Sequence, residues 1–186
     1  MQRFIIEQTD MHGLVTIKPN CYNDERGYFS ETWNYNNLKK LGFDNMLWQD
    51  SESMSKKNVL RGLHYQWNKP MGKLIRVVRG SILDVCVDIR KNSPTYGSYT
   101  SILLSEVNKK QLWAPPGFAH GILSLEEDTV TLYKCSSVYN KNGEAGIDPF
   151  DKELNIDWGI KKQDVVLSVK DSSAKSFLEY KKDPKF

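Results

Sequence analysis

The chain has 186 residues, with 26 lysines and arginines against 23 aspartates and glutamates, so its formal net charge is +3. This length fits one domain with a substantial core, and the weak, evenly spread charge argues against nucleic-acid binding. No apolar run approaches the roughly 20 residues that span a membrane, and the N-terminus lacks a stretch that resembles a signal peptide. We therefore expect a cytoplasmic protein.

Cysteine content and chain organisation support the same interpretation. Cys21, Cys86 and Cys135 are odd in number and far apart, without the spacing of a zinc site or a redox motif. We expect free thiols in a reducing compartment. No internal repeat or change in composition marks a second domain, so we expect one domain over 1–186. A short charged tail at about 181–186 is expected to be solvated.

Strand-like segments dominate the chain in sequence order. Two short helices are expected, at 34–41, with Leu38 and Leu41 as its apolar stripe and Gly42 at its end, and at 172–180. Gly80-Ser81 between two β-rich runs predicts a hairpin. Many short strands separated by turns indicate an all-β barrel or sandwich. The expected strands are 13–18, 74–79, 82–89, 99–104, 111–113, 121–125 and 129–139.

Two of the three histidines lie in glycine-containing segments that look built around them. His64 is in 61–66 (RGLHYQ), and His120 is in 115–121 (PPGFAHG). Histidine is the side chain whose ordinary pKa lies nearest neutrality, which makes it the first candidate for proton transfer. Glycines beside it allow a turn or a close approach of backbone to ligand.

Strand periodicity predicts which side chains share a face. Alternate residues of a strand point the same way, so His64 lies on a face with small and polar neighbours, as in a cavity. Tyr133 likewise lies on the more polar face of the 129–139 strand. A small barrel holds a ligand at its mouth. Strict alternation would turn Arg61 away from His64, and only a kink at Gly62 would bring the two together.

Each candidate also has an ordinary structural interpretation. His64 fits a core histidine with both ring nitrogens bonded, and His120 fits a turn. Lys73 fits a solvated strand end, Tyr133 ordinary strand packing, and Asp171 a cap of the following helix. The residues alone leave these alternatives open.

The sequence disfavours a metal site. Mononuclear sites in small barrels need three or four histidine or carboxylate ligands, whereas the first motif has Gln66 where a second histidine would help. A metal-dependent oxygenase is therefore disfavoured. No phosphate-binding glycine-rich loop and no serine nucleophile elbow are present.

Four motifs together resemble one known family. Segments 24–31 (DERGYFSE), 58–66 (NVLRGLHYQ), 73–80 (KLIRVVRG) and 115–121 (PPGFAHG) resemble the dTDP-4-dehydrorhamnose 3,5-epimerase family, and the match runs in order over 13–171. The resemblance implies a cupin-type β-barrel (jelly roll) with a few short peripheral helices. It also implies a homodimer that acts, without a metal or redox cofactor, on a nucleotide-diphosphate 4-keto sugar in polysaccharide biosynthesis.

The resemblance also implies residue roles. His64 would be the general base and Asp171 the carboxylate that orients it. Tyr133 would return a proton on the opposite face, while Lys73 with His120 would stabilise the enolate. Substrate-binding positions would be Arg61, Lys73 and His120 around the sugar diphosphate, Arg26, Phe29 and Glu31 at the nucleotide and shared across the dimer, and Gln49, Asp50, Ser51, Tyr139, Glu144 and Lys170.

Two departures from the family leave the substrate open. Ser51 replaces the usual asparagine after Gln-Asp, and 146–151 lacks the usual tryptophan. The nucleotide, a hexose or heptose sugar, and inversion at carbon 3, carbon 5 or both remain alternatives. A sugar-nucleotide ketoisomerase on the same barrel and a non-catalytic sugar-nucleotide binding protein are the alternative functions.

Overall fold

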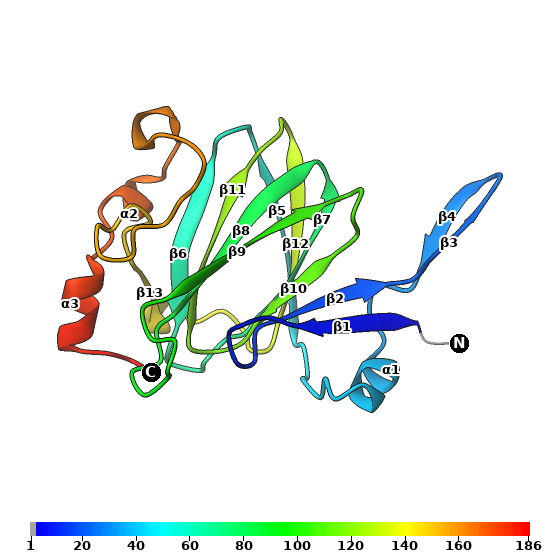
Figure 1. Ribbon diagram of the computed structural model, residues 1–186, viewed down its shortest axis with the longest axis horizontal. Helices are drawn as coiled ribbons and strands as arrows, with labels where there is room; N and C mark the ends of the chain where they lie inside the picture. The colour runs from blue at the N-terminus through cyan, green and yellow to red at the C-terminus, as the bar shows by residue number, and fades with distance from the viewer. Residues whose placement is uncertain (1–2) are drawn as a thin grey trace.

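Two antiparallel β-sheets face one another in the computed structural model, which describes residues 3–186 (Figure 1). The first sheet contains, in spatial order, β1 (Phe4–Gln8), β2 (Val15–Pro19), β10 (Gln111–Ala114), β7 (Lys73–Arg79), β12 (Thr129–Cys135) and β5 (Gln49–Ser55). The second sheet contains β13 (Glu144–Gly146), β6 (Leu60–Gln66), β11 (Phe118–Ser124), β8 (Ser81–Asp88) and β9 (Tyr99–Ser105). The expected all-β fold with a few short peripheral helices is confirmed.

Alternation along the strands divides each sheet into an inner and an outer face. On β8, Ile82 and Cys86 belong to an apolar cluster between the sheets, while Val85 and Val87 pack on the outside. The outer cluster is completed by the C-terminal segment, including Trp158. Because both faces of β8 and β11 are covered, these two strands are buried along nearly their whole length. A polar residue in such a strand therefore requires a specific partner.

The predicted hairpin at Gly80-Ser81 is wrong. Strands β7 and β8 follow each other directly but belong to different sheets, with β7 between β10 and β12 and β8 between β11 and β9. Gly80 has a φ of 77°, a conformation that glycine adopts readily. Any Cβ there would approach the Thr129 side chain to 2.5 Å. Gly80 thus allows the chain to pass sharply from one sheet to the other. A two-residue turn signal in the sequence looks the same for this connection as for a hairpin.

The strand boundaries depart from expectation at two functional positions. β12 ends at Cys135, where the backbone turns to pair with Gly72, so Tyr139 lies in a loop beyond the strand. β11 begins at Phe118, three residues earlier than predicted. His120 is consequently a strand residue, and its interpretation as a turn residue is wrong.

The first predicted helix is present as α1 (Tyr35–Lys40). Asn34 caps it, and Leu38 is fully buried. Leu41, expected in its apolar stripe, follows the helix and is exposed. The helix sits against the outer face of the first sheet near β2 (Figure 1).

The second predicted helix is two helices. α2 (Val169–Ser172) is capped by Ser168, and α3 (Phe177–Lys182) is capped by Ser176 in a capping box with Glu179. Between them the chain is extended, and Lys175 forms a parallel bridge to Ile147. Asp171 is therefore inside α2, and the cap assigned to it is Ser168 instead. Two short 3₁₀ turns, Lys141–Gly143 and Lys162–Asp164, complete the helical segments.

The C-terminal tail is docked rather than simply solvated. Its charged side chains are largely exposed, but Phe186 accepts a backbone hydrogen bond from Lys91, and its ring meets Tyr65 edge to face. The backbone of Lys185 also donates to the Tyr180 hydroxyl. No helix within residues 3–186 is long and apolar enough to cross a membrane.

A two-stranded arm projects from the sandwich. It consists of β3 (Cys21–Asp24) and β4 (Gly27–Ser30), which pair only with each other and extend away from both sheets (Figure 1). Tyr22, Tyr28 and Phe29 on this arm are exposed. A two-stranded ribbon with exposed aromatic side chains is marginal alone in water.

Candidate functional site

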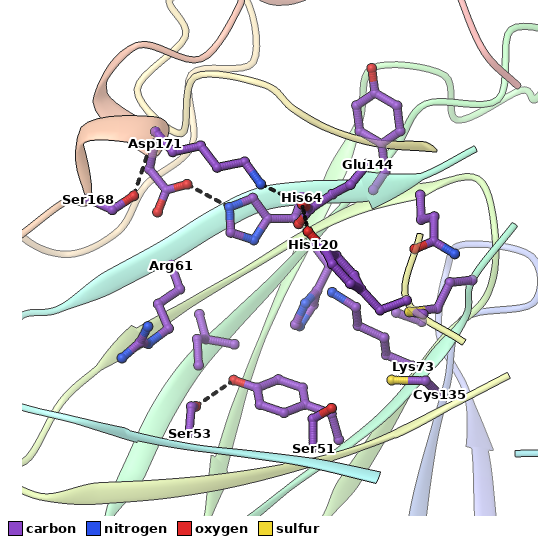
Figure 2. Close-up of a pocket in the computed structure, with 18 of the residues that line it drawn as sticks. Ser51, Ser53, Arg61, His64, Lys73, His120, Cys135, Glu144, Ser168 and Asp171 are labelled. Carbon is purple, nitrogen blue, oxygen red and sulfur yellow. Dashed lines mark hydrogen bonds and ion pairs between the residues drawn. The ribbon is translucent and has the colours of Figure 1, made fainter. Parts of the chain in front are cut away.

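A cavity of about 530 Å³ opens between the two sheets, and Ala114, Phe118 and Ile122 of the apolar inter-sheet cluster line part of it. Side chains from β6 and β11 line one wall, and side chains from β5, β7 and β12 line the other. In Figure 2, His64 and Ser53 lie on opposite sides of this space, with Lys73 and His120 between them. Eleven of the residues predicted for the site line it: Gln49, Ser51, Arg61, His64, Lys73, His120, Tyr133, Tyr139, Glu144, Lys170 and Asp171.

His64 and Asp171 form a close pair at the edge of the cavity. His64 Nε2 lies 2.6 Å from Asp171 Oδ1, although 107 residues separate them. Burial alone would raise the pKa of Asp171, but the hydrogen bond and charge of His64 and the Ser168 hydroxyl lower it overall. An ionised Asp171 accepts the Nε2 proton, so the free lone pair of a neutral imidazole is on Nδ1. The pair is arranged for proton abstraction.

An irregularity in β6 brings Arg61 to the same cavity as His64. On β11 the partners of His64 and Arg61 are two residues apart, whereas the two residues themselves are three apart. The extra residue reverses the alternation, as in a β-bulge. Gly62 has a φ of 143°, and a Cβ there would lie 2.4 Å from the Gly121 Cα. The kink that the sequence required at Gly62 is thus present, and only glycine fits it.

Tyr133 faces His64 from the opposite sheet. Its hydroxyl lies 3.0 Å from the Ser53 hydroxyl on β5. Burial raises the pKa of Tyr133 to about 12, and the hydrogen bond with Ser53 opposes this rise. A phenol of this kind keeps its proton at neutral pH and gives it only to a strongly basic acceptor.

Lys73 contributes a partly buried amine to the cavity floor. It pairs with Cys135 across β7 and β12, and its amine forms no hydrogen bond or ion pair with another side chain in the described chain. Burial lowers the pKa of Lys73, while the neighbouring Glu144 and Asp84 act in the opposite direction. A cation held without a direct partner in a dry site is available to a developing negative charge. The interpretation as a solvated strand end is wrong.

Sequence reasoning missed a second histidine–carboxylate pair. His120 Nε2 lies 2.9 Å from Asp84 Oδ1, and both side chains are buried. Asp84 is on β8, the strand beside β11, two residues from the position that faces His120. One signal was available, because Asp84 interrupts the otherwise apolar run of β8 and a buried carboxylate needs a partner.

A hydrogen-bonded rim surrounds the mouth. Glu144 Oε2 accepts from the Tyr139 hydroxyl at 3.0 Å and from Lys170 Nζ at 2.6 Å. Burial would raise the pKa of Glu144, but these two partners lower it overall. Gln49 accepts from the Tyr139 backbone and donates to Ser51. The exposed Tyr139 ring is therefore held at the rim by its backbone and by its hydroxyl.

Four predicted binding residues do not line the cavity. Arg26, paired with Asp24, and Phe29 are exposed on the β3–β4 arm. Glu31, at the base of the arm, bonds Arg3 and Asn37. Asp50 forms a 2.7 Å ion pair with Lys134 on the outer face of the first sheet. Within one chain these four residues lie outside the cavity lining.

The side chains do not form a convincing metal site. Asp84, Cys86 and His120 lie within 4.8 Å of one another, but the Asp84 carboxylate and the His120 imidazole already contact each other. Gln66, where a second histidine would be needed, is bonded to the backbone of Lys69, Val138 and Asn140. The donor set fits a buried ion pair better than it fits a metal. All three cysteines are free thiols, as expected.

The cavity combines an imidazole on one wall, a phenol on the other and an amine between them. His64 and Tyr133 belong to different sheets, so a ligand held between them is exposed to proton removal and proton return on opposite faces. Lys73 and His120 lie where an anion formed in between would be stabilised. The arrangement suits inversion at a carbon whose proton is acidified by a neighbouring carbonyl group.

Comparisons with known proteins agree with this chemistry. Residues 8–179 match the family model described as dTDP-4-dehydrorhamnose 3,5-epimerase. A curated protein of that name from Methanothermobacter thermautotrophicus is 44% identical over 180 residues, which cover 96% of this chain and 97% of the relative. A crystal structure of the Elizabethkingia anophelis enzyme of that name superposes with a TM-score of 0.90 at 39% identity, covering 95% of this chain and 98% of that one.

A second solved structure was determined with a sugar nucleotide bound. It is the dTDP-6-deoxy-D-glucose-3,5-epimerase of Legionella pneumophila in complex with dTDP-4-keto-L-rhamnose. It is 42% identical, has a TM-score of 0.90, and covers 94% of this chain and 93% of its own. Fold and length are therefore those of proteins named dTDP-4-dehydrorhamnose 3,5-epimerase.

Proposed function

The chain belongs to the dTDP-4-dehydrorhamnose 3,5-epimerase family and is an isomerase of a nucleotide-linked 4-keto sugar, and we propose that its substrate carries dTDP. The nucleotide assignment is supported by the names of the relatives and by the dTDP sugar in the Legionella complex. These names favour an epimerase over a ketoisomerase or a non-catalytic binding protein. The position of His64 opposite Tyr133 in one cavity is the observation that carries the proposal.

The first step is removal of a proton from a carbon next to the ketone. His64 Nδ1 takes the proton, the C–H electron pair forms a carbon–carbon double bond, and the carbonyl electrons move onto the carbon 4 oxygen. Asp171 holds the imidazole in the required tautomer and stabilises the imidazolium that forms. Positioned general bases accelerate such steps by about 10² to 10⁴.

The enolate oxygen needs a compensating positive charge. Lys73 supplies a cation on the cavity floor, and His120, backed by Asp84, supplies a second polar contact. Because burial excludes water from these groups, their interaction with a charge that develops during the reaction is strong. We assign Asp84 to this machinery as the carboxylate that positions His120.

Inversion requires that the proton returns on the other face. Tyr133 gives its phenolic proton to the enolate carbon, the double-bond electrons form the new C–H bond, and the ketone at carbon 4 is restored. Water then reprotonates the phenolate and removes the proton from His64. The same two residues act at carbon 3 or carbon 5, whichever is presented between them.

The nucleotide is bound at the rim and, in this proposal, by a second protomer. Arg61 reaches the cavity through the β6 bulge, and Tyr139 offers an exposed aromatic face at the mouth. The β3–β4 arm carries Arg26 and Phe29 away from its own cavity. A homodimer in which this arm reaches the partner's mouth would bring these residues to the nucleotide and cover the exposed aromatic side chains.

Proton NMR in deuterium oxide tests the proposal. A dTDP-linked 4-keto-6-deoxy sugar, with GDP, CDP and UDP analogues beside it, is incubated with wild type and with His64→Ala. We expect deuterium to enter carbon 3, carbon 5 or both with the dTDP sugar, and the variant to lose this exchange. Absence of exchange with every donor would refute the epimerase, while exchange with another nucleotide alone would refute dTDP.

A further inference from the structure

Ser53 stands directly behind the group that returns the proton. It is on β5, the edge strand beside β12, and its register partner is Thr131. Its hydroxyl lines the cavity and lies 3.0 Å from the Tyr133 hydroxyl (Figure 2). No substrate-binding or catalytic role was assigned to Ser53 by the motifs, which stop at Ser51 on this strand.

The direction of this hydrogen bond matters for the reaction. A phenol oxygen can donate one hydrogen bond and accept another, and a serine hydroxyl can do the same. If Tyr133 donated to Ser53, its proton would point away from the substrate. Proton return therefore requires the opposite arrangement, with Ser53 donating and the Tyr133 O–H directed into the cavity.

We propose that Ser53 is a positioning residue that donates its hydroxyl proton to the Tyr133 oxygen and holds the phenol toward the enolate carbon. The inference rests on the proposed roles of His64 and Tyr133. As the Tyr133 O–H bond breaks and the new C–H bond forms, the electron pair stays on the phenolate oxygen. The Ser53 hydrogen bond then becomes charge-assisted and stronger. The contact thus stabilises the transition state more than the ground state.

The burial of Tyr133 makes this contact important. Burial raises the pKa of Tyr133 to about 12, and the hydrogen bond with Ser53 acts in the opposite direction. The Arg61 charge and a smaller hydrogen-bond contribution from Thr131 also lower the pKa of Tyr133, while Asp84 raises it, so Ser53 is the largest effect that opposes burial. Loss of Ser53 would therefore leave a weaker acid whose proton is no longer directed into the cavity by this contact.

Deuterium exchange and inversion can be measured separately. Comparing the two rates distinguishes the role of His64 on one wall of the cavity from that of Tyr133 on the other. His64 alone can remove a proton, exchange it with solvent and return a deuteron on the same face, which labels unreacted substrate. Inversion also needs Tyr133, and it labels the product. A defect confined to proton return lowers only the second rate.

The experiment uses Ser53→Ala, Ser53→Thr and Tyr133→Phe, with the dTDP-linked 4-keto-6-deoxy sugar in deuterium oxide. For Ser53→Ala we expect labelled product to form about ten- to a hundredfold more slowly. Deuterium entry into unreacted substrate should stay within about threefold of wild type, because His64 is untouched. Ser53→Thr keeps the hydroxyl on a strand residue and should restore inversion.

A double variant tests whether Ser53 acts through Tyr133. Adding Ser53→Ala to Tyr133→Phe should cause no further loss of inversion. Equal loss of exchange and inversion in Ser53→Ala, or no change in either, would overturn the inference, as would a further loss in the double variant. If wild type itself places no deuterium in the sugar, the proposed function fails instead.

Discussion

The cavity contains two histidine–carboxylate pairs in different surroundings, and only the His64–Asp171 contact has the geometry of a hydrogen bond. His64 and His120 are direct partners across β6 and β11, and their carboxylates lie at 2.6 and 2.9 Å. In the first pair the side chains of His64 and Asp171 are 23% and 6% exposed. In the second pair His120 and Asp84 are 6% and 0% exposed. The carboxylates also differ in origin, since Asp171 comes from helix α2 and Asp84 from the neighbouring strand.

This difference in exposure suits the two pairs to different roles, although their side chains are chemically similar. A proton-transfer residue must exchange its proton with water in each turnover, so it needs the partial exposure of His64. A group that stabilises a charge gains from the exclusion of water, because electrostatic interactions strengthen at low dielectric constant. The deep pair, next to Lys73, has that environment. We therefore expect variants of the two pairs to fail in different ways.

The largest expected contrast is between the two histidines. His64→Asn keeps a polar side chain beside Asp171 but removes the base, so deuterium exchange should fall by about 10³ or more. His120→Asn should lose only about 10- to 100-fold, because Lys73 still faces the enolate. NMR exchange rates at saturating substrate measure both. Equal losses would show that the two pairs do not differ in role.

Lys73→Met sharpens the electrostatic side of the comparison. Burial lowers the pKa of Lys73 in the folded protein below its pKa in the unfolded chain. The protein is therefore most stable above the unfolded-state pKa, where the amine is neutral in both states. This stability is lost as the pH falls through the native pKa. At pH 7 the charged amine costs folding free energy, and Met should raise stability by about 1 kcal/mol.

The same variant should lose about a hundredfold in exchange, because the enolate loses its cation. Urea unfolding and exchange rates would be measured on one preparation. If Lys73→Met lowered both stability and activity, Lys73 would be a contact that stabilises the fold. That result would contradict its assignment as a cation held at a cost in stability to stabilise the enolate.

The family resemblance implied the pair at the mouth, and the residues alone indicated only His64 of that pair and did not indicate the deep pair as a pair. His64 lies in a short motif with Gly62 and Gln66, and strand alternation places it on a polar face. Asp84 is an isolated carboxylate in an apolar strand, and its partner on β11 is brought close only by sheet pairing. Local patterns cannot specify which strands become neighbours.

The same limit explains the errors in the fold. The strands around Gly80 were recognised, but their assignment to two sheets depends on contacts with β12 and β9 far along the chain. The 172–180 helix was interrupted by the bridge from Lys175 to Ile147, again a long-range pairing. Where a local signal sufficed, as for the Asn34 cap of α1, the prediction was confirmed.

Replacing the two carboxylates should separate stability from activity. Asp84→Asn removes a fully buried negative charge that faces His120 and lies near Lys73, so unfolding free energy should fall by about 3 kcal/mol. Asp171→Asn lies near the mouth, where water can replace part of the interaction, and should cost about 1 kcal/mol. Its exchange rate should nevertheless fall about a hundredfold. Urea midpoints in the opposite order would refute the contrast between the pairs.

A third carboxylate, Asp88, has side-chain partners that lie outside the cavity lining, so it serves as a reference for a purely structural ion pair. Burial would raise the pKa of Asp88, but hydrogen bonds from Arg90, Ser93 and Thr95 lower it to about 2. A lowered native pKa means that the stabilisation is complete above the unfolded value near 4 and is lost as the pH falls toward 2. Asp88→Asn should therefore lose about 2 kcal/mol at pH 7 and flatten the acid limb of stability.

Deuterium exchange at pH 7 separates this carboxylate from the two that serve the cavity. The Asp88 carboxylate bonds Arg90, Ser93 and Thr95, none of which lines the cavity, so Asp88→Asn should exchange like wild type at temperatures well below its unfolding. Urea titrations from pH 7 to pH 2 give the stability, and NMR gives the exchange. If the variant's stability fell between pH 7 and pH 2 as steeply as that of wild type, Asp88 could not serve as the structural reference. A variant with slow exchange would mean that stability alone can mimic the losses expected for Asp84 and Asp171, and the contrast between them would then need stability-matched variants.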